Sequence, residues 1–226
     1  MKKIALLCPA VNVFDYEIVQ WTKIINGYES QYNIVPFLIT EKDVNFKVIP
    51  GRFFSKAKCL NWAISKFINS ADIIIQTDID CLFPSELLDR TLQLCNDDNF
   101  VFCKCRRIPK DFHGNWEEYK NVKISHGEGG WNAASPNIWK KLGGYNDTIC
   151  GRGGEDIDLH WRIREIYNIP MEIIEDVPLV HVSHPHRKWN DGHQEKLNHQ
   201  KLYARWKEWK QNPTTTPNWL NKYLEK

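Results

Sequence analysis

Apolar and polar residues in the first third of the chain follow two different periodicities. Short apolar runs are typical of buried strands, and apolar residues recurring on one helical face are typical of amphipathic helices. The alternation predicts an α/β fold with a mostly parallel central sheet flanked by helices, which binds ligands at the carboxyl ends of its strands. The predicted elements are a strand at 3–8, a helix at 15–26, a strand at 33–40, a helix capped by Ser55 with Ala57, Leu60, Ile64 and Phe67 on one face, and a strand at 73–75.

The rest of the chain continues the alternation around one long segment without clear periodicity. Residues 106–130 carry mixed charge, His, Gly and Trp, and we interpret them as a long loop that closes over a bound ligand. The other predicted elements are a helix from beyond Pro84 to about Cys95, a strand at 101–103, a helix at 136–142 ended by Gly143 and Gly144, a helix at 155–167, a strand at 178–182, and an aromatic, basic helix through Leu202, Trp206 and Trp209.

Length and composition limit the possible organisation. A chain of 226 residues and 26.7 kDa can form one sizeable core or two tightly joined subdomains. Its formal net charge of +2 lacks the basic excess typical of nucleic-acid-binding proteins. The seven cysteines include no Cys-x-x-Cys pair and no secretory signal is evident, so we expect reduced thiols and a cytoplasmic protein. No apolar run approaches the ~20 residues that span a bilayer, so no transmembrane segment is expected.

Two aspartates one residue apart follow the predicted strand at 73–75. They lie in Gln76-Thr77-Asp78-Ile79-Asp80, where an extended chain would point Asp78 and Asp80 to the same side. Paired carboxylates are hard oxygen ligands that suit Mg²⁺ or Mn²⁺ bridging a diphosphate. An Asp-x-Asp is also common in surface turns, but its position after a buried strand favours a metal site.

A glycine-rich segment precedes the predicted helix at 155–167. It reads Gly151-Arg152-Gly153-Gly154-Glu155-Asp156. Acidic residues in a first turn complement the helix dipole, which would explain the acids without any functional role. That explanation leaves the three glycines unaccounted for. Glycine lets a backbone approach a ligand closely, and a carboxylate presented there is a candidate general base.

Three histidines follow the predicted strand at 178–182. They are His181, His184 and His186, within six residues of one another. A single histidine is more often structural, but a cluster at a strand end, in a chain with an Asp-x-Asp, indicates that at least one completes a metal site. The sequence leaves open which of the three binds the metal.

Taken together, these segments resemble the successive motifs of the β-1,4-galactosyltransferase-type glycosyltransferases of GT-A fold. Their order and spacing are similar over roughly residues 4–186, and chondroitin-polymerase-like domains share the layout. Polypeptide N-acetylgalactosaminyltransferase-like domains resemble the chain less, because they carry Glu-Asn in place of Glu155-Asp156. The segments are Phe54-Ser55-Lys56-Ala57-Lys58-Cys59-Leu60-Asn61, Asp78-Ile79-Asp80-Cys81-Leu82-Phe83-Pro84, Leu142-Gly143-Gly144-Tyr145 and Gly153-Gly154-Glu155-Asp156.

The resemblance implies a Rossmann-like fold that binds a nucleotide-diphosphate sugar, and it implies the residues of the donor site. Pro9, Ala10 and Asn12 would lie by the uracil and ribose of a UDP-sugar. Lys56 stands where the family has an arginine that contacts the donor. Ile79, between the two aspartates, belongs to the same donor-binding segment.

The resemblance also implies a metal site. Asp80 would bind Mn²⁺ or Mg²⁺ directly, and Asp78 would touch the ribose or the metal. His181 best matches the family's late metal ligand by its place at the strand end. His184 remains a close alternative, because the alignment can slide there.

For catalysis, Asp156 matches the family's general base and Glu155 a carboxylate that orients the acceptor. One departure concerns the tryptophan that usually precedes Gly-Gly-Glu-Asp, because this chain has Arg152 there. An arginine in this place would meet an anionic group on either substrate. Trp131 is a candidate replacement for the aromatic platform, and a buried core tryptophan is an equally good interpretation of it.

The sequence therefore predicts a metal-dependent inverting glycosyltransferase acting on a hydroxyl acceptor, expected to be a glycan. The predicted organisation is one unit over 1–226, with a nucleotide-binding half at 1–105, an acceptor half at 106–195 and a helical extension at 196–226. A non-catalytic sugar- or nucleotide-binding module is disfavoured, because it has no physical need to keep all the acidic and histidine motifs. A transferase acting on nucleic acid through residues 196–210 is disfavoured, because the aromatic residues there follow the helical spacing of a packed face.

Overall fold

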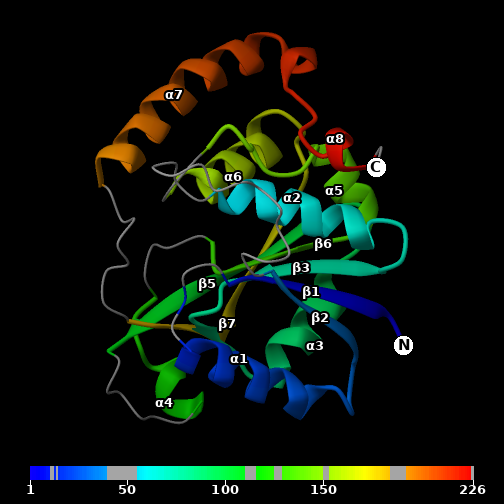
Figure 1. The fold of residues 1–226 in the computed structure, drawn as a ribbon, viewed down its shortest axis with the longest axis vertical. Helices are drawn as coiled ribbons and strands as arrows, with labels where there is room; N and C mark the ends of the chain where they lie inside the picture. The colour runs from blue at the N-terminus through cyan, green and yellow to red at the C-terminus, as the bar shows by residue number, and fades with distance from the viewer. Residues whose placement is uncertain are drawn as a thin grey trace.

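A seven-stranded sheet forms the centre of the computed structural model (Figure 1). The structure describes residues 1–10, 13, 15–39, 55–109, 116–124, 129–149, 153–183 and 192–224. In these residues the strand order is β2-β1-β3-β6-β5-β7-β4. The strands are β1 (Lys3–Pro9), β2 (Asn33–Ile39), β3 (Ile73–Thr77), β4 (Cys81–Leu82), β5 (Phe100–Ile108), β6 (Trp131–Ala134) and β7 (Met171–Val182).

The sheet is mostly parallel, as expected: among the described strands β1, β2, β3, β5 and β7 run in one direction, and β4 and β6 run opposite to them. β1 pairs with β2 and β3 in parallel, and β5 pairs with β7 in parallel. The pairs β3 with β6, β5 with β6 and β4 with β7 are antiparallel. The short strand β6, which the sequence pattern did not predict, enters between β3 and β5 and reverses the direction there. Its residues Trp-Asn-Ala-Ala include no β-branched side chain that would indicate a strand. Pairing with β3 on one side and β5 on the other stabilises it.

Helices cover both faces of the sheet (Figure 1). Successive side chains of β1 point to opposite faces. Ala5 and Leu7 therefore join the core under α2, α5 and α6, while Ile4 and Leu6 join the core under α1 and α3. The helices are α1 (Asp15–Tyr28), α2 (Lys56–Phe67), α3 (Ser85–Leu94), α4 (Trp116–Lys120), α5 (Pro136–Leu142), α6 (Glu155–Glu165), α7 (Gly192–Gln211) and α8 (Asn221–Leu224), with a 3₁₀ turn at Pro213–Thr215.

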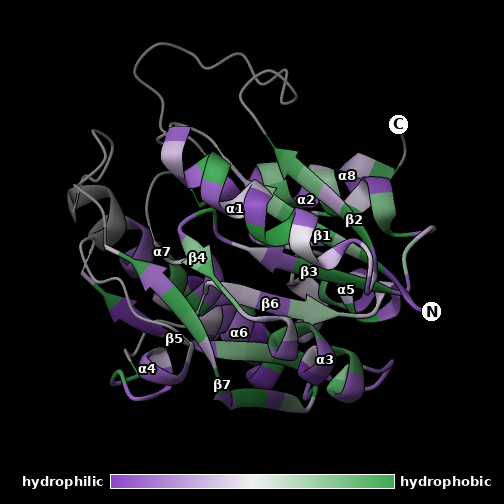
Figure 2. Cartoon of the chain, turned by 90° about the horizontal axis from the view of Figure 1, so that it is seen from below, coloured by the Kyte–Doolittle hydropathy of each residue, from purple (hydrophilic) through white to green (hydrophobic). Residues whose placement is uncertain are grey.

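Local sequence signals account for two of the helix ends near the site. Ser55 caps α2 by accepting a hydrogen bond from the Lys58 amide, as predicted. Gly143, at φ 67°, ends α5 where the sequence placed its end. In Figure 2, α1 and α3 each carry hydrophilic and hydrophobic residues, as expected of helices with one face packed on a sheet. None of the described helices has the length and apolar character needed to cross a membrane.

The segment predicted as a loop at 106–130 is partly regular. β5 extends through Ile108 and α4 occupies Trp116–Lys120, while residues 110–115 and 125–128 lie outside the described residues. The last strand is also longer than predicted, because β7 begins at Met171 rather than near residue 178. Its first half shows neither an apolar run nor a strict alternation, because Glu172 and the pair Glu175-Asp176 interrupt the apolar residues.

Helix α7 packs on the body of the protein through its apolar face. Leu202, Trp206 and Trp209 are all at least nine-tenths buried. The Trp206 ring stacks on Trp161 of α6, with centroids 4.9 Å apart and an interplanar angle of 10°. This confirms the packing interpretation of these tryptophans and leaves Tyr203 as the exposed aromatic residue of the segment.

A buried ion pair joins α6 to its neighbours. Asp158 and Arg162 lie 2.8 Å apart, and both side chains are fully buried. Asp158 also accepts a hydrogen bond from Trp206 of α7, while Arg162 donates to the carbonyl oxygens of Leu142 and Gly144 at the end of α5. The third acid after the glycines is therefore structural, because its carboxylate is committed to partners away from the solvent.

Asp158→Ala is expected to lower the free energy of unfolding by about 3–5 kcal/mol, because it leaves the Arg162 charge buried without its partner. Denaturant unfolding measures this change. The matched control is Lys210→Ala, which removes an exposed ion pair between Lys210 of α7 and Glu165 of α6 and should change stability little. Equal effects of the two variants would contradict the assigned role of the buried pair.

Candidate functional site

The predicted site residues gather at the carboxyl ends of neighbouring strands. β1 and β3 are adjacent and parallel, so Pro9 and Asp78 lie at the same edge of the sheet. Ala10 follows β1 and is held by a hydrogen bond from its amide to the carbonyl of Ile39 in β2. Asn12, the third expected uracil and ribose contact, lies outside the described residues.

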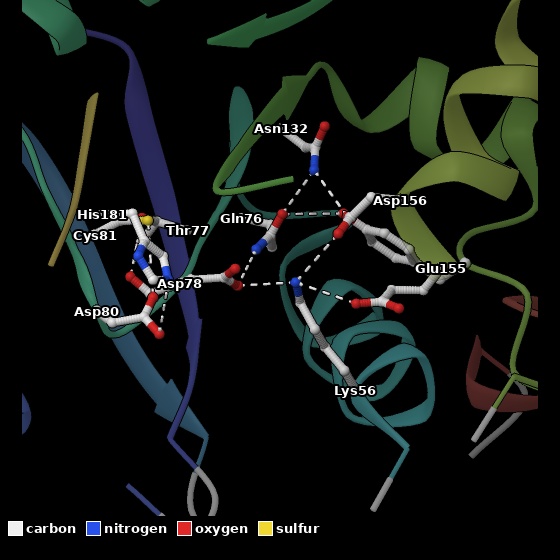
Figure 3. A network of polar contacts seen from close by, with 11 residues as sticks. Lys56, Gln76, Thr77, Asp78, Asp80, Cys81, Asn132, Glu155, Asp156 and His181 are labelled. Atoms are coloured by element: carbon white, nitrogen blue, oxygen red, sulfur yellow. Dashed lines mark hydrogen bonds and ion pairs between the residues drawn. The ribbon is translucent and has the colours of Figure 1, made fainter. Parts of the chain in front are cut away.

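Lys56 is the centre of a cluster of three carboxylates (Figure 3). Its Nζ lies 2.9 Å from Asp78 Oδ1, 3.4 Å from Asp156 Oδ2 and 3.5 Å from Glu155 Oε1. Lys56 opens α2, Asp78 follows β3 and the two acids open α6. Lys56 thus links the Asp-x-Asp segment to the Glu155 and Asp156 pair, whereas the sequence predicted only a contact between Lys56 and the donor.

Burial and charge shift the titration of this cluster. Burial raises the pKa of the Asp156 carboxyl well above its ordinary value; the Lys56 ammonium opposes this shift, while Glu155 and Asp78 reinforce it. Burial by itself would lower the pKa of Lys56, but the carboxylates of Asp156, Asp78 and Glu155 outweigh it and raise this pKa. Asp156 is therefore a stronger base than an exposed aspartate and sits beside a persistent cation.

The second aspartate of the Asp-x-Asp segment has a different partner. A hydrogen bond from the Cys81 amide to the Asp78 carbonyl closes a turn, so the segment is not extended as expected. Asp78 reaches Lys56, whereas Asp80 Oδ2 lies 3.5 Å from His181 Nε2. Figure 3 shows Asp78 between the Asp80 and His181 pair on one side and Lys56 on the other.

His181 lies beside Asp80 because β4 pairs with β7 in a register that places Cys81 opposite His181. Burial would lower the pKa of His181, but hydrogen bonding to Asp80 and the charge of that carboxylate raise it. Among the described residues, no group of three or more His, Cys, Asp or Glu side chains is arranged to hold a metal ion. His184 and His186 lie outside those residues.

The backbone conformation before α6 explains two of the glycines in this segment. Gly153 and Gly154 adopt φ values of 80° and 98°, which side-chain-bearing residues rarely adopt. Gly129, which lies before β6, packs closely on the same acid: a Cβ atom at Gly129 would come within 2.3 Å of Asp156 Oδ2. These glycines place the Asp156 carboxylate at the sheet edge. Gly151 and Arg152 lie outside the described residues.

Glu155 has one oxygen engaged and one available. Its Oε1 faces Lys56, and the residue is only 8% exposed. Its Oε2 is buried without a hydrogen-bond partner among the described residues. A buried carboxylate oxygen without a donor is costly, so Oε2 is suited to accept a hydrogen bond from a ligand.

Two expected donor contacts are corrected. Trp131 is fully buried, donates from Nε1 to Thr91 and packs edge-on against Phe83, so its ring cannot form a sugar platform. The core interpretation of this tryptophan is the right one, because β6 points it away from the site. Ile79 is 2% exposed, so its side chain belongs to the core and only its backbone can face a ligand.

Sequence reasoning missed a set of buried polar residues behind the site. Each is completely or almost completely buried, and together they link the two acidic motifs by hydrogen bonds. The available signal was a polar residue directly after the apolar run at 73–75, where a buried strand would favour another apolar side chain. The residues are Gln76, Asn132, Tyr145 and His160.

The architecture is that of the GT-A glycosyltransferase structures. No family model matches the sequence, and no curated protein matches it either. The similarity to solved structures is therefore one of fold, at low sequence identity.

The catalytic domain of Drosophila β-1,4-galactosyltransferase 7, solved with xylobiose, matches with a TM-score of 0.62 and 18% identity over 88% of this chain and 80% of its own. A mutant of that enzyme, solved with manganese, UDP-Gal and xylobiose, has a TM-score of 0.57 and 16% identity over 87% of this chain and 80% of its own. The Pyrobaculum calidifontis mannosyltransferase PcManGT, solved with GDP-Man and Mn²⁺, has a TM-score of 0.57 and 17% identity over 91% of this chain and 63% of its own.

Proposed function

We propose that the protein is a metal-dependent inverting glycosyltransferase that moves a sugar from a UDP-linked donor to a hydroxyl group of a glycan. The observation that carries the proposal is the Lys56 cluster, which brings the Asp-x-Asp segment and the Glu155 and Asp156 pair together at the ligand-binding edge of a GT-A fold. A shared fold alone is compatible with several activities. The buried acids at this edge are what favour sugar transfer.

The donor side has residues suited to a divalent cation. Asp80 and His181 present an oxygen and a nitrogen ligand from adjacent chain segments, 3.5 Å apart. This donor set fits Mn²⁺ or Mg²⁺, with further ligands from Asp78, His184 or the donor diphosphate. When bound, such an ion neutralises the charge that develops on the departing diphosphate. Lys56 lies beside Asp78 and is available to contact the same phosphates.

Asp156 is the proposed general base. Its raised pKa matches a group that must take a proton from an acceptor hydroxyl. The C–O bond to the acceptor forms at the anomeric carbon as the bond to the diphosphate breaks, with attack from the opposite face and inversion of configuration. Glu155, with Oε2 buried and without a partner among the described residues, orients the acceptor through a second hydroxyl.

A nucleotide screen by thermal shift tests the donor assignment. UDP with Mn²⁺ at 100 times its Kd should raise the melting temperature by about 5–10 °C, because binding to the native state adds about 2.7 kcal/mol. UDP without Mn²⁺, and GDP, CDP and dTDP with it, should give smaller shifts. A response to GDP alone would contradict the uridine assignment. Absence of both transfer and donor hydrolysis across a UDP-sugar panel would instead favour a non-catalytic binding module.

A further inference from the structure

A chain of buried hydrogen bonds lies directly behind the proposed base. Asn132 Nδ2 donates to Asp156 Oδ1 at 3.2 Å and to Gln76 Oε1 at 2.8 Å. Gln76 Nε2 in turn donates to Asp78 Oδ1 at 2.9 Å. Figure 3 shows Asn132 between Gln76 and Asp156, so the two acidic motifs are linked by this path as well as through Lys56.

The carboxylates of Asp78 and Asp156, at the two ends of this chain, determine how the side-chain amides of Gln76 and Asn132 are oriented. An ionised carboxylate only accepts hydrogen bonds, so both Gln76 and Asn132 must turn their NH₂ groups toward Asp78 and Asp156 respectively. The Gln76 oxygen then faces Asn132 and also accepts from the Tyr145 hydroxyl at 3.3 Å. The same constraint leaves the Asn132 oxygen facing away from the site.

His160 completes the arrangement. Its Nε2 lies 2.7 Å from Asn132 Oδ1, so this nitrogen must carry the proton and donate. The ring is fully buried and packs against Phe100 and Phe102, with centroids 5.9 Å and 4.8 Å away. If the Asn132 amide were turned the other way, its NH₂ group would face the Nε2–H of His160. Its oxygen would then face the carboxylate of Asp156.

We infer that Asn132 is a positioning residue for Asp156 and that His160 fixes the orientation of the Asn132 amide. The catalytic meaning of this inference rests on the proposed function. Asp156 Oδ2 contacts the Lys56 ammonium, which it shares with two other carboxylates, whereas Oδ1 is held by a buried amide on β6. Gly129 packs on the same carboxylate. The base is thus held in one orientation before any substrate binds.

The inference has a measurable electrostatic consequence. A hydrogen bond donated to a carboxylate favours its charged form, so losing the Asn132 bond should raise the pKa of Asp156. The other groups that shift the pKa of this carboxyl stay in place in the variants below. They are Lys56 from α2, which acts by charge and hydrogen bonding, and Asp78 after β3 and Glu155 on α6, which act by charge. The neutral Tyr145 hydroxyl also lies nearby.

His160→Phe is the main test, because the new ring keeps the contacts with Phe100 and Phe102 and removes the Nε2 proton. Carboxylate NMR titration of the full chain, with Asp156 assigned through Asp156→Asn, should show its pKa raised by about one unit. With a UDP-sugar that the wild type uses, kcat should fall about tenfold at unchanged donor KM, because the base loses its orientation. Asn132→Leu should likewise raise the pKa of Asp156 and lower kcat. His160→Gln keeps an N–H donor, so its pKa and kcat should lie between those of the wild type and of His160→Phe.

Thr91→Val is the matched control. It removes the buried acceptor of the Trp131 indole on the other face of the sheet, so it should reduce stability without moving the Asp156 titration or kcat. A folded His160→Phe protein with wild-type titration and wild-type kcat would overturn the inference. A shifted titration in a protein whose wild type transfers no sugar would support the positioning role and refute the proposed function, so the two failures are distinguishable.

Discussion

Asp156→Asn is expected to lower kcat for sugar transfer by about 10³-fold, because general base catalysis contributes about 10²–10⁴-fold and an amide cannot take the proton. Binding of UDP with Mn²⁺ should survive, since Asp156 contacts Lys56 and Asn132 rather than the Asp80 and His181 pair. Initial rates at saturating donor, together with the thermal shift by UDP and Mn²⁺, measure the two effects separately.

Asp97→Asn serves as the control for this experiment, because Asp97 is exposed between α3 and β5 and should tolerate the same chemical change. Normal transfer by a folded, nucleotide-binding Asp156→Asn protein would show that the base is another group. A parallel loss of nucleotide binding would point to a structural role for Asp156 in the Lys56 cluster and contradict the assignment as well.

Asp80→Asn is expected to reduce kcat/KM at least about 100-fold, because metal stabilisation of a leaving diphosphate is worth several kcal/mol and each 1.36 kcal/mol is a factor of ten. The additional thermal stabilisation by UDP in the presence of Mn²⁺ should disappear at the same time. His181→Ala should reproduce both effects, because its Nε2 lies beside Asp80. A Mn²⁺ titration of the thermal shift in each variant provides the measurement.

The control for the metal experiment is Asp176→Asn, an exposed acid that pairs with Arg90. It should leave the Mn²⁺ dependence unchanged. Retention of the wild-type response to Mn²⁺ by Asp80→Asn would exclude Asp80 as a ligand. If Asp80→Asn lost the response and His181→Ala kept it, the histidine would have to be His184 or His186, which the sequence left as alternatives.

Local signals allowed much of the fold to be predicted. The apolar runs of β1 and β3, the cap at Ser55 and the glycine end of α5 depend on neighbours within a few residues, and the structure confirms them. The antiparallel strand β6 could not be predicted, because it has only four residues and is stabilised by strands far away in the sequence.

The candidate site, too, was predicted only in part. The motifs identified the acids at Asp78, Asp80, Glu155 and Asp156 as chemically unusual, since each follows a strand or opens a helix. No local pattern distinguished Trp131 as a core residue or His160 as a partner of Asn132. The first depends on the packing of α3 on one face of the sheet, and the second on the packing of α6 on the other.

The sequence by itself determined the residue types and their order: an α/β alternation, two acidic motifs, a late histidine cluster and the glycines that allow α6 to start with its acids at the sheet edge. Only the tertiary structure decided their partners. Lys56 reaches carboxylates from both motifs, Asp80 turns toward His181 and Asn132 holds Asp156. The physical reason is that side-chain chemistry is local, whereas burial, charge pairing and hydrogen-bond direction depend on segments that only the folded sheet brings together.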